Sequence, residues 1–336
     1  MREFFSLSAF TVVFFALGCI TLPVTFLTGY LILTKTPKVM GSSGIFLFNI
    51  NLWYCATSFI FTILMCDNPL KGVADGFYCH VFNSKIAILF GANFGHWMLV
   101  LSTLTLYFLT ISWFWFYVYR MAQIAFDRLA RKMSSPIGWL LAALCHLIPS
   151  INFGLLVHNS RTPKATILSF NNLNSKAIQQ AIDANLTFHC YNVSDQIWNT
   201  CTIAYWVILG LAIFISLLVS LKKLRENRSV MSSKTYNLHK MFTISSIFVV
   251  CAPVVMGILP NVAFLAFMYL NIGASESFPR VCISMIATLP IWHCVIVVVT
   301  VKPYRIAFLK MFGCFRFMNV GNVVSSVRVG STSSGW

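Results

Sequence analysis

The stretch VCISMIATLPIWHCVIVVVTVKPYRIAFLKMFGCFRF, residues Val281–Phe317, decides the fold class of this chain. Its first part, Val281–Val301, contains no Asp, Glu, Lys or Arg, and about 20 such apolar residues are enough to cross a bilayer. The basic residues of KPYR (Lys302–Arg305) follow at once. After them, aromatic and basic side chains alternate at helical spacing, which is typical of a helix that lies along a membrane surface. We therefore predict a membrane span followed by an interfacial helix over residues 303–317.

The composition of the whole chain agrees with a membrane protein. Of its 336 residues, 58% are hydrophobic and only 10% are charged, whereas charged residues make up about a quarter of a soluble domain. A net charge of +16 is compatible with nucleic-acid binding, but the basic residues lie in short loops between apolar runs. We expect one polytopic membrane domain over residues 1–317, a disordered tail over 318–336, and no nucleic-acid partner.

Further uncharged stretches precede this one. Together they predict seven spans, over residues 7–34, 44–65, 86–119, 136–157, 199–221, 242–270 and 281–301. A charged side chain at a span centre costs roughly 2.5–3.5 kcal/mol on insertion scales, so its absence supports each span. The third stretch is too long for an upright helix. It either tilts, projects into the cytoplasm, or begins later at Gly91 or Gly95.

The charges of the loops orient the spans. The N-terminus and the loops after spans 2, 4 and 6 carry seven basic and six acidic side chains, a net +1. The other loops and the C-terminal tail carry 17 basic and two acidic side chains, a net +15. Because positive loops stay in the cytoplasm, the N-terminus is predicted outside and the C-terminus inside. The fold class is therefore an all-α membrane protein, a seven-helix bundle of the G-protein-coupled receptor type.

The long loop after span 4 carries the marks of an outer loop. It contains glycosylation sequons at Asn185 and Asn192. Cys190 lies in the same loop and Cys79 lies between spans 2 and 3, where disulfides persist on the outer side of a membrane. A Cys79–Cys190 bridge would tether the loop over the mouth of the bundle. A second bridge, Cys66–Cys201, stays open.

Four short patches resemble a known receptor family. They are KTPKVM (Lys35–Met40), FNINLW (Phe48–Trp53), MSSKTYNLHKMF (Met231–Phe242) and KPYR (Lys302–Arg305), and they resemble the nematode serpentine chemoreceptors of the Str superfamily, closest to class h (Srh). The resemblance implies a G-protein-coupled chemosensory receptor in the plasma membrane of sensory-neuron cilia. It also implies an odorant-like small ligand, a heterotrimeric G protein as partner, and no cofactor.

Two positions depart from the family pattern. The family usually has a histidine two residues after the asparagine of span 2, where this chain has Asn51. At the inner end of span 3 it tends to have an acidic residue, Asn and Arg, and here only Arg120 matches. Arg120 is either a switch that meets a G protein in the active state or a cation that anchors the span at the lipid headgroups.

The candidate functional residues fall into three groups. Polar or amphipathic side chains at membrane depth usually face the bundle interior, and as ligand contacts we expect Asn93, His96, Trp97, Trp292 and His293. On the G-protein side we expect Arg120, Lys234, His239, Lys240, Pro303, Tyr304 and Arg305. Cys314, in the interfacial helix on the anionic inner leaflet, is a palmitoylation candidate. Prolines in spans 6 and 7, Pro253 among them, predict kinks that are either static or hinges.

Two other function classes are weaker. A ligand-gated channel or small-molecule transporter usually places ionisable groups at the membrane midplane, where this chain offers only histidines. An enzyme is not expected, because no span carries a carboxylate pair, metal-ligand spacing or nucleophile motif. The apolar residues around the predicted ligand contacts favour a small, mostly apolar ligand. The sequence leaves open whether the receptor dimerises.

Overall fold

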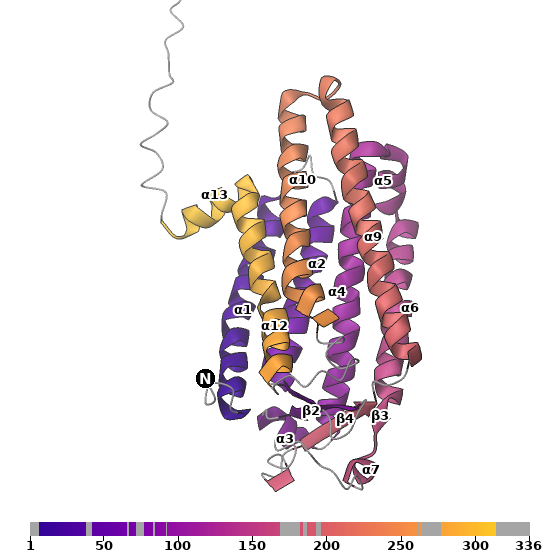
Figure 1. Ribbon diagram of the computed structural model, residues 1–336. Helices are drawn as coiled ribbons and strands as arrows, with labels where there is room; N and C mark the ends of the chain where they lie inside the picture. The colour runs from indigo at the N-terminus through magenta and orange to yellow at the C-terminus, as the bar shows by residue number, and fades with distance from the viewer. Residues whose placement is uncertain are drawn as a thin grey trace, which may run out of the picture.

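The computed structural model describes residues 7–37, 42–65, 67–71, 77–82, 85–91, 93–168, 182–183, 187–192, 196–260, 262–263 and 277–313. Within these ranges, seven helices are long and apolar enough to cross a membrane. They lie side by side as a bundle (Figure 1). The seven-helix bundle that the sequence predicts is confirmed.

The helices have the following bounds. The spanning ones are α1 (Leu7–Lys35), α2 (Ser43–Ser58) continued by the π-helical η2 (Phe59–Met65), α4 (Phe94–Ala125), α6 (Pro136–Asn159), α9 (Gln196–Glu226), α10 (Ser233–Pro253) continued by the π-helical η4 (Val254–Ile258), and α12 (Ser277–Thr300). The shorter ones are α3 (Lys85–Phe90), α5 (Asp127–Met133), α7 (Lys164–Leu168), η3 (Asn227–Ser229) and α13 (Lys302–Met311).

The third span, predicted over residues 86–119, begins later than residue 86, which is one of the alternatives that its length left open. Gly91 has φ +90°, a conformation that side chains with a Cβ rarely adopt, and it separates α3 from α4. The spanning helix therefore begins at Phe94. It also continues to Ala125, six residues beyond the predicted inner end, so Arg120 lies inside a helix rather than at its terminus.

Two further boundaries differ. Span 6 was predicted over 242–270, but α10 begins at Ser233, where the Ser232 side chain accepts a hydrogen bond from the Thr235 N–H and caps the helix. Most of the predicted outer end of this span is outside the described residues. The interfacial helix was predicted over 303–317, but α13 ends at Met311. Gly313 follows at φ +67°, the left-handed position that commonly stops a helix.

The core of the bundle is built around α4. Of its most apolar window 67% is buried, against 17% of the corresponding window of α9. Its inner half supplies large aromatic side chains to the main core, namely Trp113, Trp115, Phe116, Tyr117 and Tyr119. Helix α4 packs most extensively against α2, α6 and α9, and its rings share the main core with side chains of α10 and α12.

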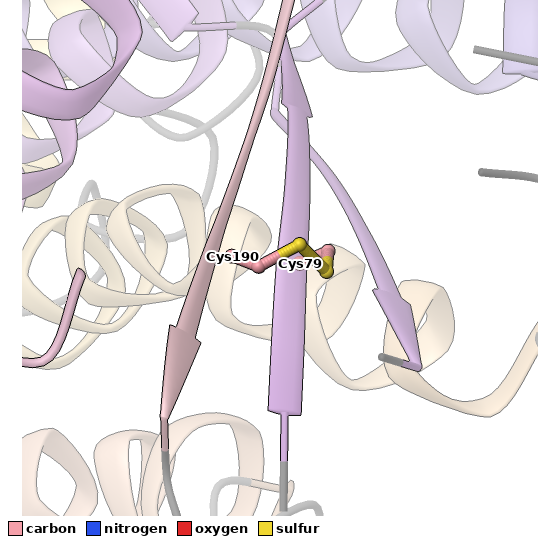
Figure 2. The surroundings of a disulfide bond; sticks show 2 residues. All are labelled: Cys79 and Cys190. Atoms are coloured by element: carbon pink, nitrogen blue, oxygen red, sulfur yellow. A yellow bond between two sulfur atoms is a disulfide. The ribbon is translucent and has the colours of Figure 1, made fainter. Parts of the chain in front are cut away.

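An antiparallel sheet that the sequence did not predict covers one end of the bundle. Its strands β1 (Asp67–Lys71), β2 (Phe77–Phe82), β3 (Arg161–Thr162) and β4 (Thr187–Asn192) pair in the order β1-β2-β4-β3. Cys79 of β2 lies opposite Cys190 of β4, and a disulfide joins them, as the sequence predicts (Figure 2). Cys66 is outside the described residues, and Cys201 is a free thiol.

The sheet is fixed to α4 by a close contact at Gly95. A Cβ at this position would lie 2.4 Å from the Phe82 ring, so only glycine lets β2 approach the helix this closely. The sheet lies at the same end of the bundle as the start of α1, and α13, α5 and the α9–α10 turn lie at the opposite end (Figure 1). The loops predicted to be outer and inner therefore separate to the two ends of the bundle.

Breaking the disulfide should destabilise the end of the bundle that the sheet covers. Cys79→Ser, Cys190→Ser and the double variant should each lower the free energy of unfolding by about 2–5 kcal/mol, because the bridge closes a long chain loop of 111 residues. Thermal unfolding of purified protein measures this. The double variant should be no less stable than either single one, and Cys201→Ser is the matched control. An unchanged melting temperature in the double variant would contradict the bridge.

Candidate functional site

A hydrogen-bonded cluster centred on His96 lies beneath the sheet. The His96 side chain is completely buried. Its Nδ1 is 2.9 Å from the hydroxyl of Tyr191 in β4, and its Nε2 is 2.9 Å from Nδ1 of His158 at the end of α6. One side chain of α4 thus joins α6 and the disulfide-linked strand β4.

The other predicted ligand contacts of α4 lie at the outer surface. Asn93 is exposed, and its Oδ1 accepts a hydrogen bond of 2.9 Å from Nη2 of Arg161. Trp97 is 53% exposed and stacks on the His158 ring, with the ring centroids 5.2 Å apart. His96 and these two residues therefore shape the mouth of the bundle.

The two predicted contacts of α12 point in different directions. His293 is buried, with its ring centroid 4.6 Å from that of Tyr54 in α2. Trp292 is 47% exposed and shares its helix face with the exposed side chains of Val295 and Val299. The prediction that both residues face the interior is therefore wrong for Trp292, because neighbouring residues on a helix point about 100° apart.

An apolar cavity lies between α4, α9 and α10 and is partly open at the surface of the bundle, because its wall residues Phe214 and Val254 are 58% and 37% exposed. Its volume is ≈ 200 Å³, and its walls include Trp113, Ile213, Phe214, Val249 and Pro253. None of the five predicted ligand contacts lines it. Sequence reasoning missed the cavity because apolar residues that face a cavity and those that face lipid follow the same pattern. The one available signal was Pro253, which ends α10 just before the π-helical turn η4.

At the inner end of α4, Arg120 is buried inside the bundle. Its side chain is 3% exposed, its Nη1 donates a 2.9 Å hydrogen bond to Oε1 of Gln123, and its guanidinium lies 5.6 Å from the centre of the Phe242 ring of α10. Nε and Nη2 have no hydrogen-bond partner. Within the described chain no carboxylate neutralises this cation, and burying an unpaired charge is unfavourable. A lipid-facing anchor would keep its charge at the headgroups, so the structure places Arg120 as an interior residue.

Helix α10 covers Arg120. Besides Phe242, it contributes the buried His239, and its Ser246 carbonyl accepts a 3.0 Å hydrogen bond from the Tyr117 hydroxyl. Lys240 is exposed beside His239. Lys234 lies in the first turn of α10, and its side chain is outside the described part of the structure. Among the described side chains, the α4–α10 contact includes the Tyr117–Ser246 hydrogen bond, the Arg120–Phe242 cation–ring contact and apolar packing.

The KPYR segment turns the chain from α12 into α13. The hydroxyl of Tyr304 is 2.6 Å from Oγ1 of Thr36, just after α1, and burial raises the pKa of Tyr304 to about 12 although this hydrogen bond opposes the rise. Pro303 occupies the first turn of α13, and the exposed Arg305 donates to the Val299 carbonyl. Tyr304 thus fastens the start of α13 to the inner end of α1.

The remaining predicted sites are only partly described. Asn192 is the exposed last residue of β4, which leaves its side chain accessible for glycosylation. Asn185 and Cys314 both lie outside the described residues. Their modification stays a prediction.

A comparison with known families identifies the architecture. The family model described as "Serpentine type 7TM GPCR chemoreceptor Srh" matches residues 6–314, which includes all seven spanning helices. A search of curated proteins finds no match to this chain.

Removing the hydroxyl that pairs with His96 should loosen the outer end. Tyr191→Phe keeps the ring that stacks on His96 but loses the hydrogen bond, so the free energy of unfolding should fall by about 1 kcal/mol. The melting temperature should drop by about 2–4 °C. Tyr30→Phe, at an exposed position of α1, is the control and should change nothing. Equal melting temperatures for both variants would contradict the hydrogen bond.

Proposed function

Because the chain belongs to the Srh family of serpentine seven-transmembrane chemoreceptors, we propose that it is a G-protein-coupled chemosensory receptor for a small, mostly apolar molecule. It is a multi-pass membrane protein, and we place it in the plasma membrane of sensory neurons, in their cilia by family resemblance. The protein acts by changing shape, with no catalytic step.

The observation that carries this proposal is the buried, unneutralised Arg120 beneath α10. A cation in this position is held out of water by contacts that are individually weak, the Phe242 ring and the single Tyr117–Ser246 hydrogen bond. Movement of α10 away from α4 uncovers Arg120 and its two unpaired nitrogen atoms. An acidic or carbonyl-bearing segment of a G protein then supplies the missing partners.

The cavity is positioned to control this movement. Its walls include Trp113 and Tyr117 of α4 and Val249 and Pro253 of α10, and Tyr117 also makes the hydrogen bond that closes the inner end. Pro253 and the π-helical turn after it interrupt the regular backbone bonding of α10, which is where helices bend. A ligand that fits the cavity better when α10 has moved shifts the population toward the open state.

Helix α13 supports the receptor at the inner leaflet. Its exposed side chains Lys302, Arg305 and Lys310 are basic, and the rings of Phe308 and Phe312 lie 4.8 Å apart. A short helix of this kind binds an anionic membrane surface through both its charges and its rings. Together with the Tyr304–Thr36 contact, this holds α13 against the membrane while α10 is free to move.

Replacing Arg120 should reduce activation of the G protein without reducing the thermal stability of the receptor. Arg120→Met removes an unpaired buried charge, so thermal stability should be unchanged or higher, whereas basal G-protein nucleotide exchange should fall at least tenfold in reconstituted membranes. Arg120→Lys should retain part of the activity. Arg131→Met removes an exposed charge from α5 and is the control for net charge.

Two outcomes would contradict the proposal. If the Arg120→Met variant stimulated G-protein nucleotide exchange as strongly as the natural receptor, Arg120 would not be a G-protein contact. Ligand-evoked membrane currents that persist when G-protein signalling is blocked would favour a ligand-gated channel instead.

A further inference from the structure

Four of the chain's seven histidines lie together where the sheet meets the bundle. His80 is in β2, His189 is in β4, His96 is in the first turn of α4, and His158 is in the last turn of α6. His80 and His189 are paired residues of neighbouring strands, and the ring centroids of His189 and His96 are 5.9 Å apart. Because the charge of a histidine changes near neutral pH, this contact gathers four pH-responsive side chains at one place.

The cluster has both buried members and an accessible one. His96 is completely buried, and His80 and His189 are 6% and 8% exposed. His158 is exposed, and its Nδ1 is 2.9 Å from Nε2 of His96. A proton from water therefore has a direct route to the buried His96 ring through His158.

The contact between His96 and His158 has room for one hydrogen. A neutral imidazole has one N–H and one acceptor nitrogen, so one ring donates to the other. Nδ1 of His96 faces the Tyr191 hydroxyl, which is able to donate or to accept. One added proton is accommodated, because both hydrogen bonds are able to reverse direction. A second added proton makes both rings positive, and the contact is then lost because N–H faces N–H.

The charges around this pair oppose protonation. Among the described side chains, the charged or titratable groups that act on His96 are His158 of α6, His189 of β4 and Arg161 of β3, and none is a carboxylate. The Arg161 guanidinium donates to the neutral amide of Asn93, which leaves its charge in place. Three further charged side chains, in β1 and α3, are outside the described part of the structure, namely Asp67, Lys71 and Lys85. Each proton taken up by the described cluster adds repulsion between like charges.

The last turn of α6 is attached to the sheet. The Ser160 carbonyl accepts a 2.8 Å hydrogen bond from the Asn192 N–H, and Arg161 pairs with Tyr191 across β3 and β4. The disulfide joins β4 to β2 in turn. Movement of His158 away from His96 therefore moves β3, β4 and β2 together.

We propose that the His96–His158 pair and the Tyr191 hydroxyl form an acid-sensitive latch between α4 and the sheet. Near neutral pH the pair is uncharged, and the last turn of α6 and β4 are held against α4. In acid both rings take up protons and repel each other, and the last turn of α6 moves away from α4 with the attached strands. Because the closed latch binds fewer protons than the released one, its stability falls as the pH falls. The loop charges predict this end outside the cell, so external acid is the signal.

Thermal stability as a function of pH tests the latch. The melting temperature of the purified full-length receptor in lipid nanodiscs is measured at about pH 7.5 and about pH 5, on either side of ordinary histidine titration. His96→Gln keeps a donor and an acceptor for its two neighbours but takes up no proton. The loss of melting temperature in acid should be larger for the natural receptor than for this variant by at least about 3 °C.

A second variant and a control locate the effect. His158→Gln, at an exposed position, should reduce the loss in acid as His96→Gln does. The double variant should reduce it no further than either single one, because the two rings titrate as one unit. His239→Gln removes a buried histidine from α10, at the opposite end of the bundle, and should keep the full loss in acid.

Nitrogen NMR of the receptor with labelled histidines separates a latch from a contact that is only structural. The spectra report which ring nitrogens carry hydrogen, and each signal is assigned by its absence from the matching variant. The signals of His96 and His158 should change together as the pH falls. In His96→Gln, the signal of His158 should change over a different pH range, because its charged form no longer faces a second imidazole.

Three results would overturn the latch. They are an equal loss of melting temperature in acid for the natural receptor and His96→Gln, disappearance of that loss in His239→Gln, and NMR signals of His96 and His158 that titrate independently. These measurements need neither ligand nor G protein. Their failure would therefore leave the proposed function untouched, and failure of the Arg120 experiment would leave the latch in place.

Discussion

Every span of this chain must cross hydrocarbon, where an unpaired charge has no water to solvate it. The sequence meets this constraint by excluding Asp, Glu, Lys and Arg from the predicted spans, and the bundle meets it by packing its helices around the aromatic inner half of α4. Arg120 is an exception to this rule. Because α4 extends beyond its predicted end, Arg120 lies in the interior, and no carboxylate of the described residues pairs with it. In the proposed mechanism, movement of α10 exposes this cation.

The outer and inner ends of α4 have different physical roles. At the outer end, His96 forms hydrogen bonds with Tyr191 and His158, and the Cys79–Cys190 bridge joins β2 to β4, so β4 is attached to the bundle by covalent and polar contacts. At the inner end, the contacts between α4 and α10 are few and mostly apolar. We propose that a rigid mouth and a loosely held inner face let a small change in the cavity appear as movement at the inner end of the bundle.

The fold could be predicted from the sequence because hydropathy and loop charge are strong, additive signals over 20-residue stretches. Single residues at the helix ends account for the boundaries that hydropathy did not predict. The late start of the third span at a glycine was among the alternatives that its length left open, whereas the cap at Ser232 lengthened the sixth span and the glycine at 313 shortened the last helix. The cavity could not be found, since Trp113, Ile213 and Phe214 of its wall match the pattern of lipid-facing residues. Polarity located His96 and His293 in the interior but gave the wrong face for Trp292.

We infer that α10 moves away from α4 when the receptor binds a G protein. The most direct measurement is the distance between two spin labels, attached through unnatural amino acids at the exposed positions Lys240 in α10 and Arg128 in α5. Double electron–electron resonance on the receptor in nanodiscs gives this distance. Addition of nucleotide-free G protein should shift the distance distribution to longer values, and the shift should be lost in Arg120→Met. An unchanged distribution with a bound G protein would contradict the account.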